Sequence, residues 1–342
     1  MKRYIYILLL IFTSASCEMR FELDIPREDS KLFAFCVPGA QDSTAIIIRP
    51  AIFAGDSIEF DPSKVEIELC INGERQNVLY QHKYNFPYFS GDHSVPEEVF
   101  YITEPVYADD VVTLNVSYTG LESISALTVI PEKPKDPVFS IDTYEYHRPL
   151  FTLEYTDSSE DSYYAVVFRE KEHFFSTWGY IEENGDIIRD TTEYVTWNHI
   201  GSGYEYDPFQ SSTEFNYSMS SNNNGVYFWK NSDAQDKDGR KSVFYELYRK
   251  HDVVNVYNEL NMSYIDYSYE AAFYRINEDL YKYYNTLMLS GNNSLANVGM
   301  ARINSIFSNI HGGFGILGGM AGEILTFDID VAESEKYLPE VY

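Results

Sequence analysis

The stretch "DVVTLNVSYTG", residues 110–120, carries the pattern that decides the fold class. Apolar and polar residues alternate along it, and its apolar positions include Val112, Leu114, Val116 and Tyr118. A period of two residues is typical of a β-strand with one buried face. The stretch "KVEIELCING", residues 64–73, alternates in the same way and ends at Asn72-Gly73, a dipeptide that suits a tight hairpin turn. The sequence therefore predicts short β-strands joined by tight turns.

Strand patterns of this kind run through residues 21–130, and they predict an immunoglobulin-like β-sandwich over residues 17–130. The prolines of "IPEKPKDP" stand at every third position, which indicates an extended linker over residues 131–138. Residues 139–342 are again rich in strand patterns but less regular. The predicted fold class is mainly β: the N-terminal sandwich, then a larger C-terminal β-rich domain with one notable α-helix.

That helix is expected near residues 277–290, in "NEDLYKYYNTLMLSG". Asn277 can cap its first turn, and Leu280, Tyr284 and Leu287 share one face at helical spacing. We expect this apolar face to pack on a sheet, with partner binding as the alternative.

The N-terminus "MKRYIYILLLIFTSASCEMR" has the basic, apolar and small-residue order of a secretory signal peptide, expected over residues 1–16. Its apolar run is too short to span a bilayer. Cys17 stands where a bacterial lipobox places its lipidated cysteine, so the sequence predicts attachment to a membrane through Cys17; ordinary cleavage nearby is the alternative. Cys70 lies on the glutamate-bearing side of its predicted strand, which argues against a disulfide with Cys36 but leaves it open.

The formal net charge is −28, from 53 acidic and 25 basic residues, so a nucleic-acid partner is not expected. The chain holds 31 Tyr and 22 Phe, residue types that suit both strands and binding surfaces. Four aromatic residues near the polar interval 201–225 are candidate ligand contacts, with core packing as the alternative role of each. They are Trp197, Tyr204, Tyr206 and Trp229.

The segment "SNIHGGFGILGGMAGE", residues 308–323, contains a formal G-x-G-x-x-G at Gly313, Gly315 and Gly318. A dinucleotide site needs a long helix after these glycines and an acidic strand end further on, and the sequence offers neither. No cofactor is therefore predicted. "EILTFDI" indicates a last strand instead, and the glycines are expected to allow positive φ angles or close backbone approach beside it.

A weak calcium candidate is formed by Asp233, Asp236 and Asp238. Its match to an EF-hand loop fails at Ala234 and Tyr245, so a solvated acidic turn is the alternative. The histidines show no zinc-binding spacing, and no G-x-S-x-G elbow is present. The sequence therefore predicts no catalytic residues and favours a protein that is not an enzyme.

Four segments resemble a family of Bacteroidota lipoproteins known as domain of unknown function 4249. They are "EMRFELDIPREDSKLFAFCVPG" after Cys17, "VEIELCINGE", "RINEDLYKYYNTL" and "IFSNIHGGFGILGG". The resemblance covers nearly all of the chain after Cys17, and its last two segments are the specific ones. It implies an outer-membrane lipoprotein that is often encoded beside TonB-dependent transporters.

We therefore expect a non-enzymatic, lipid-anchored protein of the outer membrane that serves a TonB-dependent nutrient transporter as accessory or ligand-binding partner. The N-terminal sandwich would act as a spacer, and the C-terminal part would contact the transporter or a ligand of unknown identity. A surface hydrolase acting on glycan or peptide, or an adhesive surface component, are the alternatives.

Overall fold

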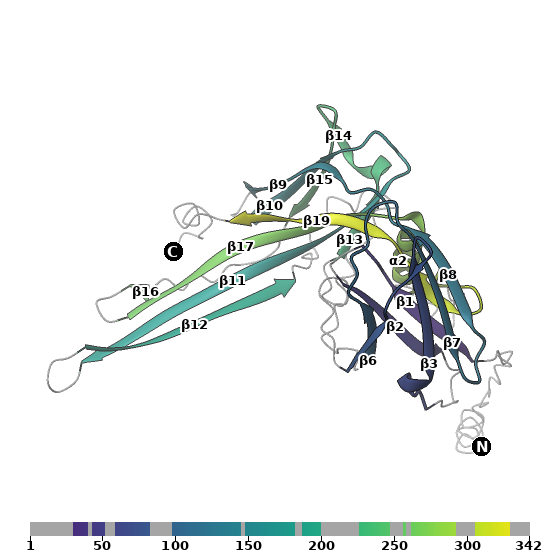
Figure 1. Cartoon of the computed structure of the whole chain (residues 1–342). Helices are drawn as coiled ribbons and strands as arrows, with labels where there is room; N and C mark the ends of the chain where they lie inside the picture. Colours follow the sequence, from purple (N-terminus) through teal and green to yellow (C-terminus); the bar gives the residue numbers. More distant parts are fainter. Residues whose placement is uncertain are drawn as a thin grey trace, which may run out of the picture.

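Figure 1 shows the chain as a computed structural model. It describes residues 30–39, 43–51, 59–82, 98–144, 148–181, 187–199, 226–246, 256–257, 261–291 and 305–328. The fold is mainly β, as predicted, with four sheets and one α-helix in the described parts. The expected signal peptide, Cys17, Tyr204 and Tyr206 lie outside the described residues.

Two sheets, built from the first half of the chain and one strand from near its end, pack face to face, and we call this unit the N-terminal sandwich. Sheet A has the strand order β18-β1-β2-β6-β5, and sheet B has the order β4-β3-β7-β8. The strands of sheet A are β1 (Lys31–Cys36), β2 (Thr44–Ala51), β5 (Leu79–His82), β6 (Glu98–Ile102) and β18 (Phe314–Leu317). Those of sheet B are β3 (Val65–Ile71), β4 (Glu74–Arg75), β7 (Val111–Tyr118) and β8 (Ile124–Val129), and a 3-10 turn, η1 (Pro62–Lys64), precedes β3.

The alternation in β7 has the predicted consequence, because the apolar positions named above are all buried in the core between the two sheets. The hairpin of β3 and β4 turns at Asn72 and Gly73, with φ angles of 51° and 83°. Cys36 is buried in this core and Cys70 is half-buried on β3; both are free thiols, so they form no disulfide.

Sheets C and D form the second unit, the C-terminal sandwich. Sheet C contains β9 (Lys135–Tyr144), β10 (Arg148–Thr156), β14 (Gln235–Lys237) and β15 (Arg240–Glu246). Sheet D contains β11 (Tyr163–Ile181), β12 (Ile187–His199), β13 (Val226–Lys230), β16 (Val256–Tyr257), β17 (Asn261–Ile276) and β19 (Met320–Asp328). Since β9 begins at Lys135, the connector between the halves is shorter than the proline spacing suggests; Pro137 fits because β9 is an edge strand.

Aromatic rings fill the core of the C-terminal sandwich. Trp229 stacks on Phe273 with 5.9 Å between ring centroids and 3° between ring planes. The indole N–H of Trp229 donates to the Tyr155 hydroxyl at 2.9 Å, and that hydroxyl donates to the Asn231 side chain at 2.8 Å. Asn231 follows β13 in a short 3-10 turn, η4 (Asn231–Asp233). The polar tips of these rings are thus satisfied inside the core, as buried polar groups require.

The helix α2 (Glu278–Gly291) joins the two sandwiches. As predicted, Asn277 caps it: its side-chain oxygen accepts from the backbone N–H of Leu280 at 3.0 Å. The Asn277 amide also donates to the Thr128 hydroxyl of β8 at 2.7 Å, across to the N-terminal sandwich. Leu280 and Tyr284 are buried, and their face packs on sheet D and against the outer side of β1, as expected for the apolar stripe.

The glycine-rich segment runs through both sandwiches. Its first strand, β18, pairs parallel with β1, and its second, β19, pairs antiparallel with β17. Before these strands, the side-chain amide of Asn309 pairs with the backbone of Leu317 in the way that a neighbouring strand would. Its oxygen accepts from the Leu317 N–H and its N–H donates to the Leu317 C=O, both at 3.0 Å. The same amide donates to Asp279 of α2 at 3.1 Å. The final strand and the close backbone approaches are confirmed, but β18 completes the sheet of the other half of the chain.

None of the described helices is both long enough and apolar enough to cross a bilayer.

Candidate functional site

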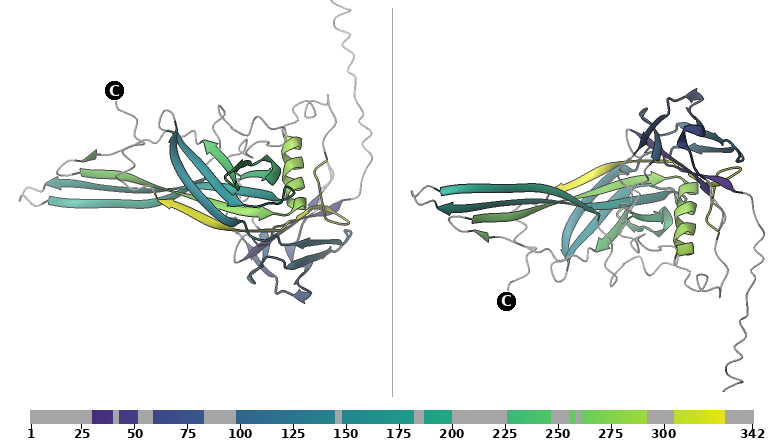
Figure 2. Two further views of the ribbon diagram at one scale, coloured as in Figure 1. Left: turned by 90° about the horizontal axis from the view of Figure 1, so that it is seen from above. Right: turned by 90° about the horizontal axis from the view of Figure 1, so that it is seen from below.

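An arm of three long strands, with the two-residue strand β16 paired to its β17 edge, projects beyond both sandwiches, as Figures 1 and 2 show. It consists of residues 169–181 of β11, all of β12, and residues 261–270 of β17. The strands are long: β11 has 19 residues and β17 has 16. β11 and β12 pair in unbroken register from Arg169 opposite His199 to Ile181 opposite Ile187. The strands of sheet C lie over the root of sheet D and leave the far part of the arm uncovered (Figure 2).

One ion pair and one histidine–carboxylate contact tie the arm strands together. Arg169 pairs with Glu270 between β11 and β17, where both side chains are more than four-fifths buried. His173 contacts Glu193 between β11 and β12, with 2.7 Å between Nε2 and Oε1. Polar side-chain contacts between strands therefore lie at the root of the arm, where the continuous apolar core ends.

One face of the arm exposes large apolar side chains. Trp178 is 61% exposed and Tyr180 is 56% exposed, both on β11, and Ile188 on β12 is 39% exposed. Tyr180 and Ile188 are directly opposite each other, and Trp178 lies two residues from Tyr180, so the three share one face. We call these three residues the aromatic face.

The aromatic face lies on the same side of β11 as the residues that form the hydrophobic core at the root of the arm. On the same side of β11, Tyr164, Val166 and Phe168 are buried against sheet C. The alternation therefore carries on past the end of the covering sheet. Large exposed apolar groups gathered in one place are typical of a surface that binds a partner.

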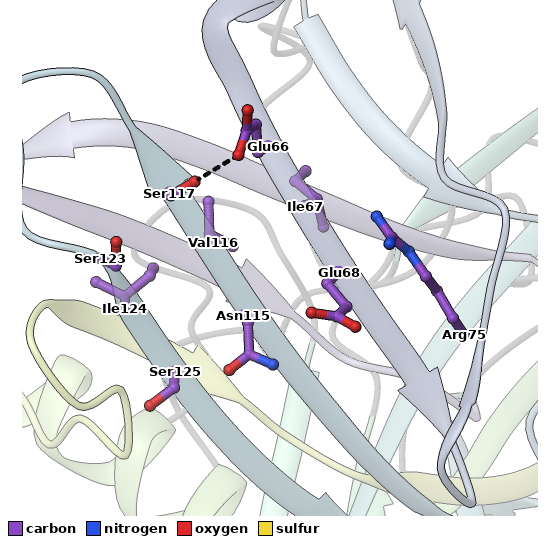
Figure 3. A pocket seen from close by; sticks show the side chains of 10 residues that line it. All are labelled: Glu66, Ile67, Glu68, Arg75, Asn115, Val116, Ser117, Ser123, Ile124 and Ser125. Atoms are coloured by element: carbon purple, nitrogen blue, oxygen red, sulfur yellow. Dashed lines mark hydrogen bonds between the residues drawn. The ribbon is translucent and has the colours of Figure 1, made fainter.

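A second candidate is a shallow hollow of about 460 Å³ on the outer side of sheet B, drawn in Figure 3. Its polar side chains are Glu66, Glu68, Arg75, Asn115, Ser117, Ser123 and Ser125. The Ser117 hydroxyl donates to Glu66 at 3.2 Å. These groups can hydrogen-bond a polar molecule, but all except the half-buried Ser117 are exposed, so water competes for each bond. The hollow is the weaker candidate.

Of the four predicted ligand contacts, the structure describes the backbone of Trp197 and the whole of Trp229. Trp197 lies on β12 opposite Lys171, while Trp229 is 1% exposed, in the core packing that was its alternative role. Tyr204 and Tyr206 lie outside the described residues. The sequence does not predict the arm, because the charged residues of "REKEH", residues 169–173, interrupt the apolar pattern of the strand. In the structure β11 continues through them to Ile181.

The acidic segment of the weak calcium candidate forms a hairpin between β14 and β15. Asp238 and Gly239 make its turn, with φ angles of 52° and 79°, and Asp236 pairs with Lys241 at 3.1 Å. Over the described part of the chain, no three His, Cys, Asp or Glu side chains converge in a way that could hold a metal ion. Asp236 and Asp238 are exposed in this hairpin, whereas Asp233 is half-buried and lies before it in η4.

This geometry defines the class of protein: a β protein with two sandwiches and a projecting arm. The family model that matches it is described as "Domain of unknown function (DUF4249)", and the match covers residues 18–323. The chain belongs to this family. The helix α2 and the glycine-rich segment lie within the matched residues and contact both sandwiches. No curated protein matches the chain significantly.

Proposed function

We propose that the protein is a lipid-anchored component of the outer membrane that binds a TonB-dependent nutrient transporter through its arm. The observation that carries the proposal is the exposure of Trp178 and Tyr180, at 61% and 56%, where no described strand covers them. Tryptophan and tyrosine are enriched at the centres of protein interfaces, where they give large contact area at low entropic cost. Burying them against a partner removes apolar surface from water.

The anchor rests on Cys17 and the apolar run before it. In this arrangement the lipid holds the N-terminal sandwich at the membrane, and the sandwich supports the arm at a distance from the anchor. We expect Cys17→Ser to move the protein from the membrane fraction to the soluble fraction of fractionated cells. A variant that stays as firmly membrane-bound as the natural protein would contradict the lipid anchor.

The partner is tested by affinity purification of the full-length lipidated protein from envelopes in mild detergent. We expect an outer-membrane transporter to co-purify with the natural chain. The variant Trp178→Ser with Tyr180→Ser should lose most of it, by roughly ten-fold or more, because truncated aromatic anchors typically cost at least 2 kcal/mol of binding energy.

The matched control is Leu127→Ser with Val129→Ser on β8. These residues are also exposed, at 58% and 47%, but lie on sheet B. The control should retain the transporter. Equal recovery with the arm variant, or recovery of no transporter by any of the proteins, would contradict the proposal.

A further inference from the structure

The outer edge of β12 is a long row of backbone donors and acceptors. Among the described strands, β12 pairs with β11 alone, and its 13 residues keep one register throughout. Natural proteins usually protect such an edge with proline, charged side chains, a bulge or a short strand, because an open edge pairs with another chain. The sequence of β12, "IIRDTTEYVTWNH", contains neither proline nor lysine and its register shows no bulge, while its charges, Arg189, Asp190 and Glu193, include both signs and can be complementary to those of a second copy.

We propose that β12 pairs antiparallel with β12 of a second copy of this chain, which makes the arms of two molecules one continuous sheet. A two-fold axis perpendicular to the sheet keeps each face beside its like face. In an antiparallel pair, directly opposed residues have their side chains on the same face. The axis must therefore lie midway between the two copies of one residue, which is then opposite its own counterpart; we name each register by that residue and say that the axis passes through it. The possible registers are therefore few.

Charge selects among these registers. An axis through residue 189, 190 or 193 places two arginines, two aspartates or two glutamates directly opposite each other, which is unfavourable. An axis through Thr191 places position 189, an arginine, opposite position 193, a glutamate, twice over. The same axis places Thr191 opposite Thr191 of the other copy, which is a favourable cross-strand pair. By contrast, an axis through Thr192 places no residues of opposite charge opposite each other. Thr191, Thr192 and Glu193 are all exposed on β12, so they are accessible to a second copy.

The pairing would also join the two aromatic faces, since the axis leaves them on the same side of the joint sheet. Residues 187–195 of both copies take part, and Ile188 lies on this side. The dimer thus presents a doubled apolar surface. It does not depend on the transporter proposed above, because the argument uses only the edge and its charges.

The register is tested by disulfide trapping in the full-length, detergent-extracted protein with Cys70→Ser as background. Directly opposed Cα atoms lie about 4.5–5.5 Å apart, within the range that a disulfide can bridge. Under mild oxidation Thr191→Cys should form covalent dimers at least several-fold faster than Thr192→Cys, whose symmetry mate is offset in this register. Faster trapping at residue 192, or none above the Cys70→Ser background, would overturn the proposal.

A charge exchange tests the dimer without new cysteines. Glu193→Arg places like charges opposite each other and should raise the dimer dissociation constant roughly ten-fold, as measured by sedimentation. Adding Arg189→Glu restores opposite charges with reversed signs and should recover most of the affinity, although the contact of Glu193 with His173 is absent in both variants. A natural chain that stays monomeric at all concentrations, or a double variant no better than the single one, would overturn the proposal.

Discussion

Gly315 lies where the glycine-rich segment passes closest to the N-terminal sandwich. Its φ is 111°, and a Cβ on it would overlap the backbone carbonyl of Ala34 in β1. Neither the angle nor the contact tolerates a larger residue. The glycine is thus required by the parallel pairing of β18 with β1.

We expect Gly315→Ala to lower the free energy of unfolding by about 3 kcal/mol or more, since β18 must move away from β1. Gly120→Ala is the matched control, because Gly120 has a φ of 92° with open space around it. It should lose only the conformational part, about 1 kcal/mol. Urea denaturation of both variants measures this, and equal losses would show that the close approach is unimportant.

Asp157 links stability to pH at the edge of the aromatic core. Burial opposes its charge, but the Tyr164 hydroxyl at 2.5 Å and the Ser159 N–H at 2.8 Å donate to it, and together with Ser162 they hold its pKa below the ordinary value. Its folded pKa therefore lies below the unfolded value of about 3.9. The stabilisation is complete above pH 4 to 5 and is lost as the pH falls through the folded pKa.

The variant Asp157→Asn removes this titration. We expect the natural chain to be more stable than the variant at pH 7, and the difference between their melting temperatures to shrink as the pH falls towards 3. A difference that stays constant from pH 7 to pH 3 would contradict the role assigned to the carboxylate.

At the scale of elements, α2 depends on Asn277 for both its first turn and its attachment to β8. Asn277→Ala removes the cap and the bond to Thr128, and we expect it to cost about 2 kcal/mol of unfolding free energy. Asn277→Asp keeps an oxygen that can accept from the helix and should cost clearly less. Chemical denaturation of the two variants checks this, and an alanine variant as stable as the natural chain would contradict it.

Elements with strong local signals could be predicted from the sequence. The alternation in β7, the Asn72-Gly73 turn and the cap and apolar face of α2 each depend on neighbouring residues alone. The length of β11 could not, because Arg169 in its charged interruption pairs with Glu270 on β17, 101 residues further along the chain. The pairing of β11 with β17, and with it the arm, follows from contacts of this distant kind.

At the scale of the molecule, the two halves are not independent along the sequence. Phe314 in β18 stands opposite Phe33 in β1, and Ala321 in β19 stands opposite Arg275 in β17. No local pattern reveals such a parallel pairing of the two ends of the chain, so a division of the sequence near residue 131 could not show it. One continuous segment thus belongs to both cores.

This connection predicts cooperative unfolding. Loss of either sandwich removes a strand support from the other, so we expect thermal unfolding to show one transition, with calorimetric and van't Hoff enthalpies in agreement. Two separated transitions would mean that the segment around β18 and β19 does not couple the halves.

The central claim is that the aromatic face of the arm meets an outer-membrane transporter, and site-specific photo-cross-linking in intact cells tests it most directly. A photoreactive side chain replaces Ile188 at the edge of the aromatic face, or, as the control, Leu127 on β8, which is the more exposed of the two. The account predicts a cross-link from position 188 to a TonB-dependent transporter and none from position 127. A transporter cross-link from position 127 but not from position 188, or from neither, would contradict it.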